Sequence, residues 1–364
     1  MLKVEDITLS SKPAFLRDPY REWAAREGVP VIEDFGVDLL DIAAGPWPRF
    51  GVEGAIIHLK GRGDFISVFM LELRPGRNTA PQKHLYEQVI YVLAGHGSTT
   101  IETMSGKSSS FEWGPGSLFA IPMNVRYQHF NGSGTEYVRL SVTNNLCIMM
   151  KLFGCDSFIF QNDFAFPCEA LTQHEFTGDG GYIPAPRGRV MWETNFVPDL
   201  HTAELLSDDK RGKSSANQIF ILADCKMHAH CSLMPVGTYK KAHRHGPDYH
   251  VMIVDGEGFS LFWYEGDKEF VRVDWKPGCM FAPPDQMFHQ HFNTSPHPAR
   301  YMATALGNSR YPFTEKNLQG KLGVDVSLKD GGMQIEFEDQ DPRIHSLYLD
   351  ALAKNDVTCR MPWM

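Results

Sequence analysis

The chain carries the pentapeptide Tyr127-Gln128-His129-Phe130-Asn131 and, about 160 residues later, the near copy His289-Gln290-His291-Phe292-Asn293. A glycine and a proline precede each copy at the same spacing, and a glycine and a histidine recur further upstream. These matched pairs are Gly116 with Gly278, Pro122 with Pro284, Gly76 with Gly237, and His84 with His245. An internal duplication explains the coincidences better than chance, so the sequence predicts two related folded units.

The two copies differ at the positions where chemistry is expected. The second copy has three histidines where the first has one. The two sets are His243, His245 and His289 in the second copy, and Gln82, His84 and Tyr127 in the first. Amides are weak metal ligands, and a phenol must lose its proton to become a good one. The sequence therefore predicts a metal site in the second copy alone.

These spacings resemble the two sequence motifs of the cupin superfamily. The first motif is a glycine, five residues and His-x-His; the second is a glycine, five residues and a proline that leads to a histidine and an asparagine. The family's glutamate ligand falls on Tyr249 here, and on Gln88 in the first copy. The acidic neighbours Asp248 and Glu87 are one residue out of place, so on a strand they would face the opposite side. The resemblance covers most of residues 50 to 310 and implies an all-β fold of two tandem jelly-roll barrels.

The pattern of residues along the chain agrees with this fold. From Gly51 onward, short apolar runs that are typical of strands alternate with glycines and prolines that are typical of turns. Asp18-Pro19 predicts the start of a short helix, and Asp341-Pro342 predicts the start of a last one. The alternation of Met333, Ile335 and Phe337 predicts an added strand. We expect five parts: a helical arm (1–48), a first barrel with a degenerate, metal-free site (49–150), a connecting region (151–210), a second barrel with the metal site (211–310), and a strand-and-helix tail (311–364).

Alternate residues on a strand face the same side, so His243 and His245 are expected to point into the barrel together. His289 should come from a neighbouring strand, and three neutral imidazoles would leave metal positions open for substrate and dioxygen. This set resembles the three-histidine iron sites of gentisate-type and salicylate-type ring-cleaving dioxygenases, which are also bicupins without the glutamate. Those enzymes carry iron in the N-terminal barrel, whereas this chain has its complete set in the C-terminal one. The resemblance implies Fe(II); imidazole also suits Mn, Zn and Ni.

Four further residues are candidates for the site, each with a structural alternative. Tyr249 could hydrogen-bond substrate or fill the core, and His291 could shuttle a proton, although its twin His129 favours a shared structural hydrogen bond. Lys241 has the parity of His243 and could hold a substrate carboxylate, or it could be solvated. Gln286 could donate to substrate or simply occupy a turn.

A second His-x-His pair, His228 and His230, lacks the flanking motif. We interpret these two histidines as structural groups or as support for the ligands.

Composition restricts the partners. The formal net charge of −9 and the pI near 5.9 argue against nucleic acid and anionic membranes, and favour a small molecule. Seven cysteines without CxxC spacing indicate buried thiols in a reducing compartment. The start of the sequence has no apolar signal core. We expect a cytoplasmic protein and, from the resemblance, a homodimer or homotetramer.

The leading functional hypothesis is a mononuclear non-haem Fe(II) dioxygenase. It would bind a chelating substrate, such as an aromatic hydroxy acid or a diol, and use O2 for oxidative C–C cleavage in aromatic catabolism. One alternative is a metal-dependent cupin isomerase, lyase or decarboxylase using Mn, Zn or Ni without O2. Another is a non-catalytic bicupin that binds a small molecule.

Overall fold

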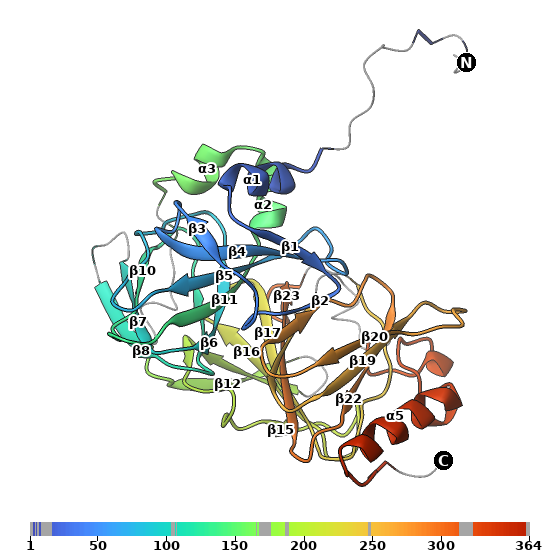
Figure 1. Ribbon diagram of the computed structural model, residues 1–364. Helices are drawn as coiled ribbons and strands as arrows, with labels where there is room; N and C mark the ends of the chain where they lie inside the picture. Colours follow the sequence, from blue (N-terminus) through green and yellow to red (C-terminus); the bar gives the residue numbers. More distant parts are fainter. Residues whose placement is uncertain are drawn as a thin grey trace.

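Two barrels follow one another along the chain in the computed structural model (Figure 1). The structure describes residues 17–102, 106, 108–164, 166, 176–185, 189–246, 249–312 and 323–361, together with residues 3, 5, 7 and 8. The predicted all-β architecture with short helices is confirmed.

The first barrel pairs a large sheet with a small one. The large sheet has the order β1 (Val31–Asp34), β4 (Val52–Leu59), β5 (Ser67–Leu73), β11 (Val138–Asn144), β6 (Gln88–Ala94), β9 (Leu118–Ile121) and β14 (Phe196–Val197), with β3 (Gly45–Trp47) paired to β4. The small sheet has the order β10 (Arg126–Phe130), β7 (Gly97–Glu102) and β8 (Ser108–Trp113).

The second barrel repeats this plan. Its large sheet has the order β12 (Gly180–Ala185), β13 (Arg189–Thr194), β16 (Ala216–Leu222), β17 (Met227–Met234), β23 (Ala299–Leu306), β18 (His250–Asp255), β21 (Cys279–Phe281) and β2 (Gly36–Asp38), with β15 (Leu206–Ser207) paired to β16. The small sheet has the order β20 (Val271–Trp275), β19 (Gly258–Trp263) and β22 (Phe288–Asn293).

The barrels share a core between their large sheets. On β5, Phe69 and Leu71 point into the first barrel, whereas Val68 and Met70 belong to a cluster that also contains Met252 of the second barrel. Successive residues of a strand face opposite sides, so a strand buried on both faces is apolar at every position.

Strands from outside each barrel complete its large sheet. β2, near the start of the chain, pairs with β21 of the second barrel, and β14, which follows the first barrel, pairs with β9. The segment expected to be a helical arm therefore also supplies β1, β2 and β3, because edge strands need partners that cover them.

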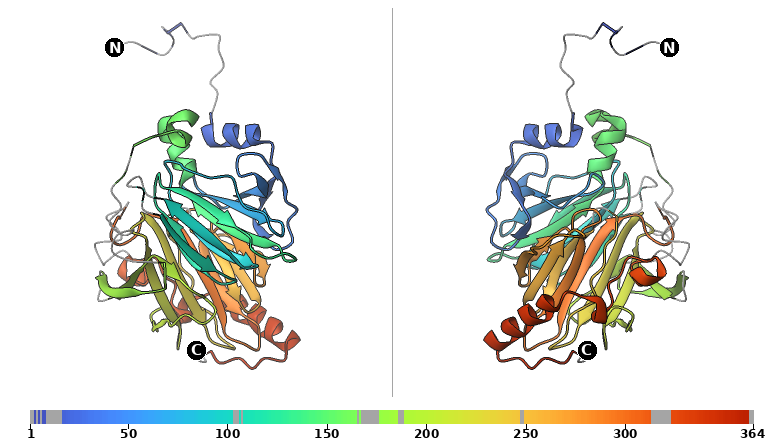
Figure 2. Two further views of the ribbon diagram at one scale, coloured as in Figure 1. Left: turned by 90° about the vertical axis from the view of Figure 1, so that its left-hand side faces the viewer. Right: turned by 90° about the vertical axis from the view of Figure 1, so that its right-hand side faces the viewer.

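Helices cover the two ends of the molecule (Figure 2). At one end lie α1 (Pro19–Glu27), capped by Asp18 as predicted and ended by Gly28, with α2 (Leu146–Phe153) and α3 (Asp156–Phe160). At the other lies α5 (Pro342–Lys354), capped by Asp341, with Ile344 and Tyr348 on its buried face.

The prediction of a strand at Met333–Phe337 is wrong. Gln334 makes only isolated bridges, to His243 and to Ser327, and the short 3-10 helix η5 (Phe337–Asp339) ends the alternation; another, η4 (Leu328–Asp330), precedes it. The segment still contributes pairing, because the Ile335 N–H donates to the Ala242 carbonyl.

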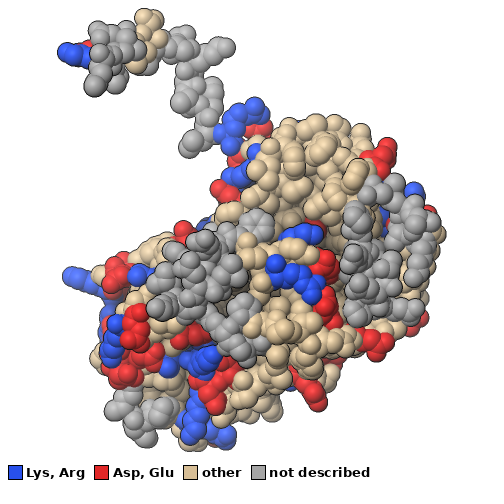
Figure 3. Space-filling model, turned by 180° about the vertical axis from the view of Figure 1, so that it is seen from behind, with Lys and Arg blue, Asp and Glu red and all other residues tan. Residues whose placement is uncertain are grey.

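The surface carries both signs of charge. On the face drawn in Figure 3, the described lysine and arginine side chains are interspersed with aspartate and glutamate.

Among the described thiols, Cys147, Cys225 and Cys231 are buried as expected, but Cys155 is exposed; Cys168 lies outside the described residues. In the part of the chain that the structure describes, no helix combines the length and apolarity needed to cross a membrane.

Candidate metal centre

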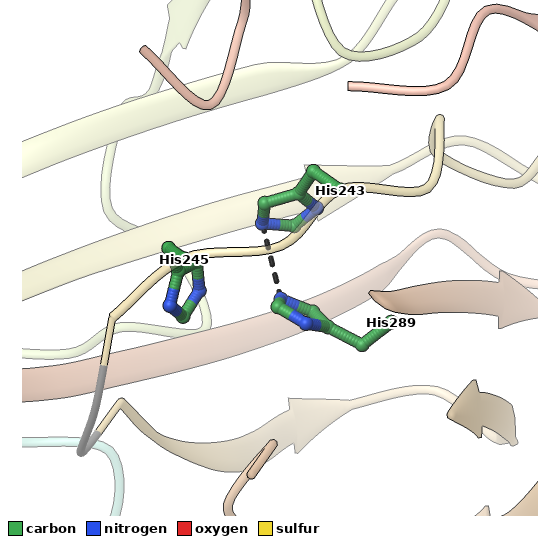
Figure 4. Close-up of side chains that lie close together, drawn as sticks. All are labelled: His243, His245 and His289. Atoms are coloured by element: carbon green, nitrogen blue, oxygen red, sulfur yellow. Dashed lines mark hydrogen bonds between the residues drawn. The ribbon is translucent and has the colours of Figure 1, made fainter. Parts of the chain in front are cut away.

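The three predicted ligands converge in the second barrel (Figure 4). His243 and His245 lie on the extended segment between β17 and β18, and His289 lies on β22 beside them. An antiparallel bridge joins His243 to His289, which brings the two sequence motifs side by side. Arg244 points away, toward Glu265, as the alternation predicts.

The distances between the rings suit a single ion. One ligand nitrogen from each histidine lies within 4.8 Å of the others, and the Nε2 atoms of His243 and His289 are 3.1 Å apart. Two imidazoles that bind one ion at about 2.1 Å, at angles between 90° and tetrahedral, have nitrogens roughly 3.0–3.4 Å apart. Two bare nitrogen lone pairs this close would repel each other, so a proton or a metal ion must lie between them.

Backbone carbonyls fix the tautomers of two of the rings. Nδ1 of His245 is 2.9 Å from the Gly246 carbonyl, and Nδ1 of His289 is 3.1 Å from the Met287 carbonyl. A carbonyl can only accept, so each Nδ1 carries the hydrogen and each Nε2 presents a lone pair to the cavity.

Burial keeps the three rings neutral. It lowers the pKa of His245 to about 4, and holds the pKa values of His243 and His289 well below the ordinary range. Neutral imidazole is the form that binds metals, so none of the three rings has to lose a positive charge near neutral pH. Among the described residues, the group that could hold an ion contains no carboxylate.

An ion pair missed by the sequence analysis lies against the first ligand. The guanidinium of Arg211 has its Nη2 atom 2.5 Å from Nδ1 of His243, and its Nη1 atom 3.5 Å from Asp325. Its charge is the second cause, after burial, of the lowered pKa of His243. Arg211 comes from the loop after β15 and Asp325 from the tail, so no motif spacing could have linked them to the site.

A cavity of about 140 Å³ opens beside the three imidazoles. Its other polar lining side chains include His228, His230 and Ser232 of β17, Tyr301 of β23, and Lys240. An engineered cavity of roughly 150 Å³ holds benzene, so this space fits a molecule of one ring or smaller.

Lys240 places a cation in this cavity. It is only 3% exposed, its Nζ lies 5.0 Å from the centroid of the Tyr301 ring, and no carboxylate of the described chain forms an ion pair with it. Burial alone would raise the pKa of Tyr301, but Lys240 and Arg211 nearby lower it below the ordinary value.

Tyr249 and His291 both line the cavity. The Tyr249 ring centroid is 4.4 Å from that of His245. His291 Nδ1 is 2.8 Å from Ser260 Oγ, which in turn accepts from the Trp275 indole.

The first barrel repeats the same arrangement around its twin histidine. His129 Nδ1 is 2.7 Å from the Thr99 hydroxyl, which accepts from the Trp113 indole. This shared triad supports the structural interpretation of His291. Because the hydroxyl accepts from the indole, its own hydrogen can go to Nδ1, which leaves the His291 hydrogen on Nε2.

Lys241 does not reach the cavity lining: its ammonium pairs with Glu336, and Lys240 takes the inward position. The reason is a β-bulge. Tyr239 bridges Phe292 and His243 bridges His289, so four steps on one strand face three on the other. One extra residue reverses the parity expected of a regular strand.

Gln286 is likewise outside the lining. It is exposed, its amide donates to Asp285, and its φ of 59° places it in a turn. Asn124, its counterpart in the first barrel, has the same φ of 59°, so the turn belongs to the fold of both barrels.

The equivalent place in the first barrel is closed by its own contacts. His84 Nε2 is 3.0 Å from the Tyr127 hydroxyl, and the Gln82 amide donates to the Arg49 carbonyl. Glu87 faces away, as predicted, and pairs with Lys226 of the second barrel. Asp248 lies outside the described residues.

His228 and His230 were not assigned to the site from sequence, yet both line the cavity. Their even spacing on one strand is the signal that could have placed them together, but the sequence does not show which face of β17 is turned to the metal ligands.

Known proteins support the fold. No family model matches the chain. A stretch of 72 residues is 29% identical to 5-aminosalicylate 1,2-dioxygenase of Comamonas sp., and covers 20% of this chain and 18% of that enzyme. The match therefore spans less than a fifth of that curated relative.

Solved structures match over much more of the chain. An oxalate decarboxylase structure, solved to study substrate binding and reaction specificity, aligns with a TM-score of 0.50 at 12% identity, over 77% of this chain and 78% of that one. A structure of the Bacillus subtilis oxalate decarboxylase, solved in work on its Mn(II) centres, gives the same values. At this identity the likeness concerns the fold. With two cupin barrels in tandem and a three-histidine group in the second, the protein is a bicupin by fold.

Proposed function

We propose that the protein is a mononuclear Fe(II) dioxygenase that cleaves a chelating, one-ring hydroxy acid or a similar diol. The observation that carries this proposal is a group of three neutral imidazoles beside a small cavity of the second barrel, with no carboxylate in the group among the described residues. His243, His245 and His289 would hold the metal. Iron would supply Lewis acidity and one-electron access to O2.

The other cavity residues would bind and orient the substrate. Lys240 and Arg211 offer cations for a carboxylate, in place of the Lys241 and Gln286 roles expected from sequence. Tyr249 would contact the substrate beside His245, and His291 would present an N–H donor. The short match to 5-aminosalicylate 1,2-dioxygenase, whose name describes a ring substrate with a carboxylate, agrees with this substrate class.

A second candidate is a Mn-dependent lyase or decarboxylase. The buried cation of Lys240 and the small cavity suit the carboxylate of a small acid equally well. We also expect a cytoplasmic homodimer or homotetramer.

An oxygen electrode separates the candidates. Protein purified without air and loaded with Fe(II) should consume about one O2 per substrate when given salicylate, its amino and hydroxy derivatives, or catechols. Turnover of an acid without O2 would favour the lyase, and no turnover with Fe(II), Mn(II), Zn(II) or Ni(II) would favour a binding protein.

A further inference from the structure

A pair of hydrogen-bonded histidines lies on the wall of the metal cavity. His228 and His230 are two residues apart on β17, so both face inward, and Nε2 of His228 is 2.7 Å from Nδ1 of His230. One of these nitrogens must carry the hydrogen and the other accept it. The two rings therefore form one unit, in which a proton gained at one outer nitrogen is shared through the inner hydrogen bond.

The fold itself does not require this pair. In the second barrel His230 lies between Ile219 and Ala303 in the sheet, and the strand registers place Phe69 at the same position of the first barrel, between Ile56 and Val142. Phe69 belongs to the apolar core there.

The position of His228 also holds a different residue in the first barrel. It lies opposite Ala305, and its counterpart Ser67 lies opposite Asn144 and donates to that side chain. Two imidazoles thus replace a phenylalanine and a serine only in the barrel that has the three-histidine group.

Binding of a chelating hydroxyl creates a need for a proton acceptor. A hydroxyl that binds a metal as an anion must lose its hydrogen, and a base in the cavity wall can take this hydrogen directly. The three ligand imidazoles use their lone pairs for the metal. His291 is held through Nδ1 by Ser260, in the same triad that holds His129 in the first barrel, so its contacts fit a structural role.

The remaining basic groups of the described lining are two carboxylates and the histidine pair. Asp325 is engaged with Arg211, and Asp208 lies beside them in the lining. The histidine pair differs from the two carboxylates because it can share an added proton over two hydrogen-bonded rings.

We propose that His228 and His230 act as one general base, which takes the hydroxyl proton of the chelating substrate. The inference rests on the proposed function, because it requires a substrate of this kind. In the step, the substrate O–H bond breaks and an N–H bond forms at an outer nitrogen, either Nδ1 of His228 or Nε2 of His230. The oxygen keeps the electron pair, the pair of rings becomes cationic, and no oxidant or reductant takes part.

Counting protons tests the assignment without any turnover. Salicylate is titrated anaerobically into the metal-loaded protein by calorimetry, in two buffers of different ionisation enthalpy. The wild type should release close to zero protons per bound salicylate, because the pair retains the proton. The double variant His228→Gln, His230→Gln should release close to one, and its affinity should rise about tenfold per pH unit.

Controls separate this inference from the proposed function. The surface variant His297→Gln should behave as the wild type, and metal content should be equal in all proteins. If the double variant does not fold, a second double variant, His228→Asn with His230→Asn, should give the same shift in proton count, because it also removes both rings. Equal counts in wild type and variants would overturn the role of the pair alone, whereas a wild type that does not bind salicylate would overturn the proposed function together with it.

Discussion

At the scale of single residues, the buried Lys240 is expected to lower the stability of the fold and to bind a negatively charged ligand. Its ammonium is buried, and no described carboxylate pairs with it. Burying an unpaired charge is costly, so such a group weakens the protein unless a ligand brings the opposite charge. The same position in the first barrel, counted from the glycine of each first motif, is Thr79.

Replacing this cation should therefore have opposite effects on stability and on binding. Lys240→Met is expected to raise the free energy of unfolding by about 1–3 kcal/mol, because it removes an uncompensated charge and keeps much of the side-chain volume. It should weaken the binding of a substrate carboxylate by at least about tenfold. Urea denaturation and calorimetric titration measure the two effects. Lys241→Met, which removes the partner of Glu336 at the neighbouring position, should not weaken ligand binding; a variant at Lys240 that loses stability but still binds normally would contradict this account.

At the scale of elements, the bulge before His243 explains both the success and the failure of the sequence analysis. Spacing predicted the three ligands, because each lies at a fixed distance from a glycine or a proline. The prediction that Lys241 points into the barrel, as His243 does, was wrong. It assumed a regular strand, and the extra residue between Tyr239 and His243 cannot be seen in one sequence. The first barrel has the same bulge, between Asn78 and Gln82, so comparing the copies gave no warning.

Contacts between elements that are distant in sequence could not be predicted. Arg211 and Asp325 approach the ligands from a loop and from the tail, and only the folded chain brings them together. The duplication, the fold and the ligand trio are local patterns and could be predicted; the polar wall opposite the ligands depends on which strand faces the cavity.

The last helix holds the motif segment of the second barrel in place. The buried hydroxyl of Tyr348 in α5 donates its one hydrogen to the Asn293 carbonyl, at 2.8 Å, and also lies 3.1 Å from the Thr238 carbonyl; these two residues belong to the two cupin motifs. Tyr348→Phe should lower the free energy of unfolding by about 1–2 kcal/mol, because the buried carbonyls that share this hydrogen lose their donor. Chemical denaturation measures this loss. The exposed Tyr264→Phe is the matched control and should be neutral; equal stabilities for the two variants would mean that the helix does not anchor the motif.

At the scale of the whole molecule, the two barrels pack as one body through a shared apolar core. Gly61 marks their closest approach, since a Cβ there would lie 1.8 Å from the Ala282 carbonyl oxygen of the second barrel. Gly61→Ala should therefore cost at least about 2 kcal/mol. Gly132→Ala, whose Cβ would meet nothing within 4 Å, is the control. Thermal unfolding compares them, and a harmless Gly61→Ala would show that the barrels do not pack this tightly.

Buried neutral histidines should also make the molecule sensitive to acid. Burial lowers the pKa of both His84 and His129 to about 3. Since these folded-state values lie below the unfolded value of about 6.5, the unfolded chain binds more protons at intermediate pH. Stability is full above about pH 6.5 and falls toward pH 3, by up to about 1.4 kcal/mol per pH unit for each ring.

Denaturation of the metal-free protein between pH 8 and pH 5 measures this slope. The variant His129→Gln should have a shallower dependence, by up to about 1.4 kcal/mol per pH unit below pH 6.5. A wild type whose stability does not change over this range would contradict the neutral, buried state of these rings.

The whole account depends on where a metal ion binds. Anomalous diffraction from crystals of the Fe(II)-loaded protein, recorded at the iron absorption edge, tests this most directly. We predict one peak per chain, about 2.0–2.3 Å from nitrogens of His243, His245 and His289, with no peak in the first barrel. A peak beside His84 and Tyr127, or none beside the three histidines after metal loading, would contradict it.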